Sequence, residues 1–238
     1  MRKFRSLNKA AMRWAMLLLA LGAVLASTVS CLNHSPAAAT AAVARSLPVN
    51  AESGPEMVLG PSDVPGTLQQ ISISAPAGGP YVSEFIDPLS VTGSPTSTDG
   101  IIAVKSTVTI ETNPRSADTE FEQASGLASA DLQKAVVTRY PHATNITVAE
   151  QPSSLQNADR QRQFRLTFTA QNMRLYEYRF RVRVRYAVAD VTVIGEAKPD
   201  RSEPSALKHD AAQIAQAEVH DMHAVMNATS TQANPIGP

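Results

Sequence analysis

A long alternation of apolar and charged residues between Phe164 and Val188 constrains this chain more than any other feature. Phe164, Leu166 and Phe168 alternate with polar residues, and a second alternating run extends from Met173 to Val188. The apolar members of the second run are Tyr176, Tyr178, Phe180, Val182, Val184, Tyr186 and Val188, and the charged ones are Glu177, Arg179, Arg181, Arg183 and Arg185. A period of two over this length predicts two strands of an antiparallel hairpin.

The same period constrains the turn between the two strands, because a shift of one residue moves every side chain to the other face. A two-residue loop at Gln171-Asn172 would set Phe164 opposite Arg179 and mix apolar with charged side chains. A loop of odd length, or a bulge, would set Phe164 opposite Phe180 and gather the apolar residues on one face. We therefore expect a three-residue loop or a bulge near Asn172, whose tolerance of positive φ suits that geometry.

Strands and helices are also predicted on both sides of the hairpin. Residues Ile101 to Glu111 alternate and predict a half-buried strand, with Ile102, Val104, Val108 and Ile110 on one face. Helical spacing extends from Ala117 to Arg139, with Ser116 as the expected N-cap and Pro141 just beyond the end. Gly126 leaves a kink or a split into two helices open.

Three further elements complete the prediction. A strand is expected at Val191 to Glu196, after a turn at Ala189-Asp190. A last helix is expected from Pro204 to about Met226, with Leu207, Ala211, Ile214, Ala215, Met222 and Val225 facing inward. Upstream, Gln69 to Ala75 and Tyr81 to Ile86 are candidate strands, and Leu89 to Gly100 has the composition of a loop.

The first 31 residues have the order of an export signal. Five basic residues precede an apolar run from Trp14 to Ala26, and small residues then lead to Cys31, the only cysteine. The run is shorter than the roughly 20 apolar residues that a membrane-spanning helix needs, so we expect cleavage. Thr28-Val29-Ser30-Cys31 resembles a bacterial lipoprotein signal, with Thr28 in place of the usual Leu, and predicts a lipid on Cys31. Ordinary signal-peptidase cleavage after Ala26 or Ala39 is the alternative.

These observations divide the chain into four parts: a signal peptide at 1–30, a flexible tether at 31–56, one α+β domain at 57–226 and a disordered tail at 227–238. Removal of the signal leaves 16 Lys and Arg against 21 Asp and Glu, a net charge of −5. A mildly acidic domain lacks the bulk positive charge of nucleic-acid binders. The predicted location is the extracytoplasmic side of a bacterial cell membrane, with the chain anchored there.

The order of strand, helix, long hairpin, strand and C-terminal helix resembles the PsbP-like superfamily, which includes exported actinobacterial lipoproteins of the LpqN type. The stretches that carry the resemblance are IIAVKSTVTIE, VVTRYPHATNITV, RQFRLTFTAQNMRLYEYRFRVRV and VTVIGEA, within about residues 101–225. The resemblance implies an α/β sandwich around an antiparallel sheet. It also implies an accessory or scaffold role, with no catalytic residues to transfer.

The arginines of the hairpin are the candidate binding site. Arg179, Arg181, Arg183 and Arg185 would form a line of cations about 20 Å long, since alternate residues lie about 6.6–6.8 Å apart, with Arg165 on the neighbouring strand. Such a row suits anionic lipid head groups, a glycan carboxylate or an acidic protein. The alternative is a solvated sheet face, on which Glu111, Glu177 or Glu196 pair with the guanidinium groups across strands.

Motifs for chemistry are weak in this sequence. His220 and His223 lie three residues apart and could share a metal, but a third ligand would have to come from elsewhere. There is no nucleophile elbow, phosphate loop, His-Glu-x-x-His or Cys-x-x-Cys, and we predict no catalytic residue, metal or cofactor. The predicted function is a non-enzymatic, membrane-tethered binding or scaffold lipoprotein. The alternatives are a carrier of a small apolar or lipid ligand and, less favoured, a hydrolase.

Overall fold

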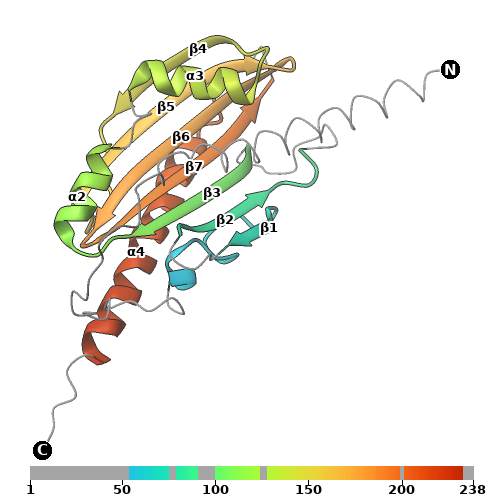
Figure 1. The fold of residues 1–238 in the computed structure, drawn as a ribbon. Coiled ribbons are helices and arrows are strands. Elements are labelled where there is room, and N and C mark those ends of the chain that lie inside the picture. The colour runs from blue at the N-terminus through green and yellow to red at the C-terminus, as the bar shows by residue number, and fades with distance from the viewer. Residues whose placement is uncertain (1–53, 75–78, 91–99, 124–127, 199–200, 233–238) are drawn as a thin grey trace, which may run out of the picture.

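The computed structural model describes residues 54–74, 79–90, 100–123, 128–198 and 201–232 (Figure 1). The signal segment, Cys31 and the tether up to Ser53 lie outside the described residues, so the expectations for them remain predictions. Within the described part, the chain forms one domain of strands and helices around a single antiparallel sheet. The predicted α+β class is therefore confirmed.

The sheet has seven strands in the order β1-β2-β3-β7-β6-β5-β4, and all neighbours are antiparallel. The strands are β1 (Gln69–Ser74), β2 (Tyr81–Ile86), β3 (Ile101–Ile110), β4 (Thr144–Gln151), β5 (Arg160–Ala170), β6 (Met173–Val184) and β7 (Ala187–Ala197). The predictions of β1, β2 and β3 as strands are confirmed. β4, an edge strand with a largely exposed and polar sequence, was not predicted.

Helices cover both faces of this sheet (Figure 1). α2 (Pro114–Gln123) and α3 (Ser129–Arg139) lie on one face, and α4 (Leu207–Gln232) lies on the other. The short 3-10 helix η2 (Gly54–Met57) packs beside α4. The result is three layers, with one hydrophobic cluster under α4 and two on the opposite side of the sheet, one under α3 and a small one under α2.

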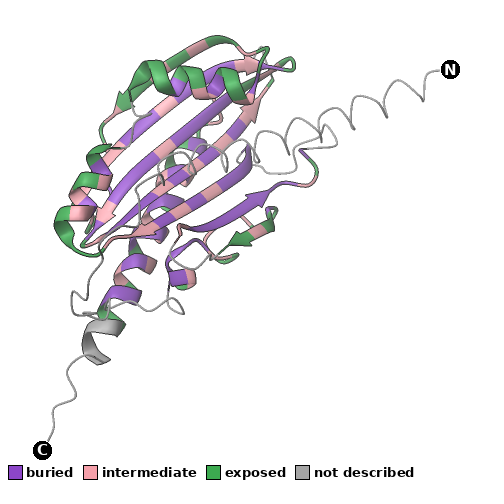
Figure 2. Cartoon of the chain, viewed as in Figure 1, coloured by how far each residue is buried: buried purple, intermediate pink, exposed green. Residues whose placement is uncertain are grey.

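The clusters under α4 and α3 take most of their hairpin residues from different strands. Tyr176, Tyr178 and Phe180 of β6 belong to the cluster under α4. Phe164, Leu166 and Phe168 of β5 pack instead with Leu132 and Val136 of α3. Figure 2 shows the consequence: the central strands are largely buried, because helices cover the sheet on both sides.

This division contradicts the predicted turn. Gln171 and Asn172 form a two-residue loop, both with positive φ (52° and 61°), and Phe164 lies opposite Arg179. The expectation of a three-residue loop or a bulge was wrong because it assumed that only one face of the sheet is buried. With both faces covered, each strand buries its apolar residues on its own side, and a two-residue turn satisfies the twist of the strands.

The second turn of the hairpin region also differs from its prediction. β6 ends at Val184 and β7 begins at Ala187, so the chain turns at Arg185-Tyr186 and not at Ala189-Asp190. Arg185 has a φ of 52°, which places it in the turn and outside the strand. Apolar and polar residues keep alternating in the sequence past this turn, because β7 begins with an alternating run of its own.

The predicted helix from Ala117 to Arg139 is two helices, as Gly126 allowed. Ser116 is not the N-cap. Its backbone N–H donates to the Asn113 side-chain oxygen over 2.9 Å, which makes Asn113 the cap of α2 and Pro114 its first residue. α3 ends at Arg139, two residues before Pro141, as predicted.

β3 and α4 match their predictions with one exception each, a reversed side chain in β3 and a later end in α4. Val104 and Val108 face α4, but a register shift between Ile101 and Ala103 turns Ile102 to the opposite cluster. All six residues predicted to face inward from α4 are buried, and the helix ends at Gln232 instead of near Met226. No helix in the described ranges is both long and apolar enough to cross a membrane.

Candidate functional site

The predicted arginine row is divided between the two faces of the sheet. Arg179, Arg181 and Arg183 point to the face that α2 and α3 cover, because their register partners lie there with Phe164. Arg165 pairs with Tyr178 and so points to the α4 face. Arg185 lies in the turn. The expectation of one continuous solvated row was therefore wrong, for the same reason as the predicted turn.

Arg181 is the most buried of these arginines, with only 5% of its side chain exposed. Its guanidinium donates to the backbone carbonyl oxygens of Glu120 (2.6 Å) and Phe121 (3.2 Å), both in the last turn of α2. It also forms ion pairs with Asp190 and with the Glu120 carboxylate. A cation at the end of a helix satisfies its unpaired carbonyls and matches its dipole, so Arg181 fixes α2 on the sheet.

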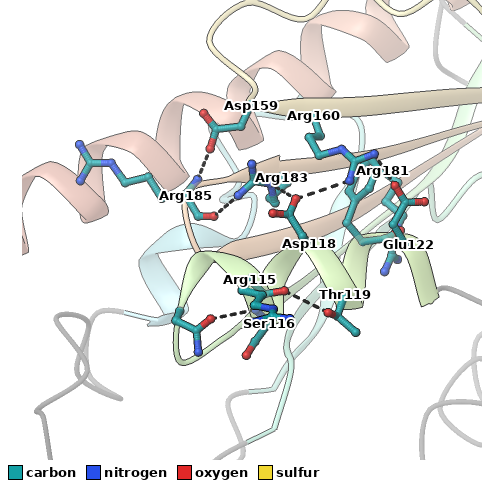
Figure 3. A network of polar contacts seen from close by, with 12 residues as sticks. Arg115, Ser116, Asp118, Thr119, Glu122, Asp159, Arg160, Arg181, Arg183 and Arg185 are labelled. Atoms are coloured by element: carbon teal, nitrogen blue, oxygen red, sulfur yellow. Dashed lines mark hydrogen bonds and ion pairs between the residues drawn. The ribbon is translucent and has the colours of Figure 1, made fainter.

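Asp118 of α2 extends the same network (Figure 3). It lies between two arginines of the sheet, with Oδ1 3.3 Å from Arg183 Nε and 3.5 Å from Arg160 Nη1. Arg160 also pairs with Glu122, one turn further along α2. The acidic residues of α2 thus serve as partners for strand arginines, in addition to favouring the positive end of the helix.

Glu177 carries the deepest charge on this face, with a fully buried side chain. It binds Arg139 at the end of α3 (3.0 Å) and Arg179 on its own strand. Burial by itself would raise the pKa of Glu177, but the charges of Arg179 and Arg139 outweigh that effect and hold the pKa below its usual value. This three-residue group joins α3 to the centre of the sheet.

The two remaining predicted arginines hold other parts of the chain. Arg165 forms an ion pair with Glu203 in the segment before α4, over 2.5 Å. Arg185 donates to the Met226 carbonyl (3.3 Å) and to the Asn227 side chain (2.8 Å) near the end of α4. Both keep more exposed surface than Arg181.

The histidine pair and the predicted lipid site give little further information. His223 Nε2 lies 2.7 Å from the Asn157 carbonyl oxygen, a contact within the chain. No group of three or more metal-binding side chains lies together in the part of the chain that the structure describes. Cys31 is outside the described residues.

Sequence reasoning missed Glu218, a fully buried carboxyl group of α4. Its Oε2 accepts a hydrogen bond from the Leu59 backbone N–H over 3.1 Å, which joins α4 to the segment after η2. Burial raises the pKa of Glu218 to about 8; the nearby Ser106 hydroxyl opposes the shift, whereas Asp221 and Asp63 add to it. Its position between Ala215 and Met222, within the apolar stripe of the helix, was the signal that could have revealed it.

The strand β1 presents the other unpredicted feature, since it is largely exposed (Figure 2) and contains apolar residues. Ile71 and Ile73 are 45% and 60% exposed, and both lie on the outermost strand at this end of the sheet. Most large apolar residues of the described chain are buried, so two exposed isoleucines on one edge strand mark it as a candidate contact surface.

Comparison with known proteins leaves the family of this chain open. No protein-family model and no curated protein matches the sequence. Among solved structures, the crystal structure of human STARD10 aligns with 71% of this chain and 76% of its own, at 8% identity and a TM-score of 0.19. A similarity of this size carries no argument about fold or function.

The buried pairing of Glu177 predicts that two glutamates that both bind arginine contribute very differently to the free energy of unfolding. Glu177→Ala leaves Arg139 and Arg179 without their buried partner, and we expect a loss of about 3–5 kcal/mol in the free energy of unfolding. Glu150→Ala breaks the exposed pair with Arg162 and should cost less than about 1 kcal/mol. Urea denaturation measures both, and equal losses would contradict the role given to Glu177.

Glu218 predicts a stability that falls with rising pH. The folded protein holds the Glu218 proton more tightly than the unfolded chain, whose pKa is near 4.5. The contribution of Glu218 to the free energy of unfolding should therefore be largest below about pH 4.5 and decrease until about pH 8. Asp221, whose pKa burial raises to about 6, acts in the same direction at lower pH. Between pH 6.5 and 8, Glu218→Gln should flatten the decrease and Asp221→Asn should not. An unchanged slope in Glu218→Gln would exclude Glu218 as the cause.

Proposed function

We propose that this protein is a non-enzymatic binding or scaffold domain of the bacterial cell envelope, tethered to the membrane by a lipid on Cys31. The anchor is supported by the basic start, the short apolar run and the single cysteine that follows it. The PsbP-like, LpqN-type resemblance of residues 101–225 supports an exported accessory protein. The 25 or so residues of the tether would have a root-mean-square span of about 25–30 Å, which keeps the domain close to the membrane.

The observation that carries the binding role is the exposed edge of β1. An edge strand offers unpaired backbone N–H and C=O groups to another chain, and natural proteins usually protect such edges with charges, proline or bulges. Gln69–Ser74 contains neither charge nor proline and exposes Ile71 and Ile73, and the irregularity that it has is one register shift between Gln70 and Ser72 in its pairing with β2. A strand of this kind suits recognition by strand addition.

An anionic partner remains a second candidate for the same domain. Because Arg181 is buried in contacts with α2, such a partner would have to meet the two arginines of the predicted site that keep the most exposed surface, Arg165 and Arg185. Each already has a partner within the chain. We therefore place strand addition at β1 ahead of anion binding.

The carrier hypothesis requires room between the sheet and α4. The side chains that meet there, including Val182, Val219 and Met222, are fully buried and belong to one packed cluster. A ligand in that position would have to displace this packing, which costs the contacts that hold α4. The structure thus favours a binding module over a carrier, and the hydrolase hypothesis gains no support from the groups described above.

Metabolic labelling with palmitate tests the anchor. We expect the wild-type protein to take up label in a bacterial host and Cys31→Ser to take up none, because the thiol is the site of attachment. Thr28→Leu restores the residue usual in lipoprotein signals and should raise the labelled fraction. Label in Cys31→Ser, or none in the wild type and in Thr28→Leu, would refute the lipid anchor.

A further inference from the structure

We propose that residues 54–68 are a strap, which Glu218 of α4 holds against the domain and which loosens as the pH rises above neutral. The strap consists of η2 and the turns that lead from it to β1. Its release would lengthen the connection between the sheet and the part of the chain that precedes it. The proposal concerns the folded domain and depends neither on strand addition at β1 nor on the lipid at Cys31.

The first argument is the way in which the strap is attached. It contributes no strand to the sheet, and it rests on the domain through buried apolar side chains: Met57, Val58, Leu59, Val64 and Leu68. Of the hydrogen bonds that it forms within the described chain, one reaches another element, from the Leu59 backbone N–H to Oε2 of Glu218. The others are internal, as in the turn between Gly60 and Asp63. The strap can therefore leave while all seven strands stay paired.

The second argument is that the surroundings of Glu218 suit a protonated carboxyl group. Ser83 of β2 and Ser106 of β3 are register partners, and by strand alternation both face α4. Their hydroxyl oxygens and Oε1 of Glu218 are buried without a hydrogen-bond partner in the described chain. At the same level of the sheet, β7 and β6 present the apolar residues Val191 and Phe180. A carboxylate in this position would be poorly compensated, and burial of such a charge is costly.

The third argument concerns the charges that face Glu218 from the strap and from α4. Burial raises the pKa of Glu218 to about 8, and the carboxylates of Asp221 on α4 and Asp63 on the strap add to the rise. His220 acts on Asp221, and the remaining acid of the strap, Glu56, is exposed. An open strap would give Glu218 to water, where its pKa is near 4.5. Opening therefore releases a proton and becomes more favourable as the pH rises.

Thiol labelling of a buried strap residue tests the proposal. In a Cys31→Ser background, Val58→Cys makes the introduced residue the only thiol of the full chain. Its labelling rate, corrected for the thiolate fraction with the urea-unfolded variant, should rise about tenfold per pH unit between about pH 6.5 and 8, because one proton leaves with each opening. Glu218→Gln, which is neutral at every pH, should remove most of this rise. Glu56→Gln, at the exposed acid of the same strap, should retain it.

A second reporter separates release of the strap from unfolding of the domain. Val191→Cys, in the same Cys31→Ser background, places the thiol at a fully buried site of β7. At pH 8, Val58→Cys should label about a hundredfold faster than Val191→Cys, since the strap opens with the sheet intact. Hydrogen–deuterium exchange of the wild-type chain repeats the comparison without a substitution, and residues 54–68 should exchange faster than residues 187–197.

Circular dichroism verifies that each labelled variant is folded. Equal labelling rates at the two positions, or equal exchange of the two segments, would mean that the strap leaves only when the domain unfolds, and would overturn the proposal. A labelling rate of Val58→Cys that does not change with pH, or a rise that survives Glu218→Gln, would overturn it as well.

Discussion

The two-residue turn at Gln171-Asn172 is the constraint on which the rest of the structure depends. It fixes the register of β5 against β6, and with it the face to which every side chain of both strands points. Phe164 and its neighbours on β5 then need a cover on the face opposite α4, and α3 provides it. The same register places the strand arginines under α2 and α3, where each needs an acidic or carbonyl partner.

Those partners explain the composition of the helices. Asp118 and Glu122 of α2 bind arginines of the sheet, and Arg139 at the end of α3 binds Glu177. Buried ion pairs often add little net stability, because the cost of removing charges from water offsets their attraction. Their effect here is to determine position, since a displaced α2 or α3 would leave buried charges unpaired. The arginine-rich run that the sequence suggests as a surface thus forms contacts inside the structure, between the sheet and helices α2 and α3.

The sequence was sufficient for most of the elements, with β4 missed, and insufficient for their faces. Alternation in β3 and β6 and the apolar stripe of α4 identify a strand or a helix whatever its surroundings, and these predictions are confirmed. The register could not be predicted, because an arginine has an apolar stem and a charged end and is compatible with either a solvated or a covered face. The buried role of Arg181 depends on carbonyls of α2 some 60 residues away in sequence. Glu218 lies on the apolar stripe of α4, so helical periodicity could have identified it as a buried carboxyl group.

The central claim, a sheet buried on both faces by this register, is tested most directly by nuclear Overhauser effects between α protons. Thr167 lies opposite Tyr176 in the described pairing, and in a two-residue hairpin this pair is one of those without mutual hydrogen bonds, whose Cα atoms are about 4.5 Å apart. We predict a strong effect between the α protons of Thr167 and Tyr176. A strong effect between Phe168 and Tyr176 in its place would restore the odd-length turn and contradict the two-sided sheet.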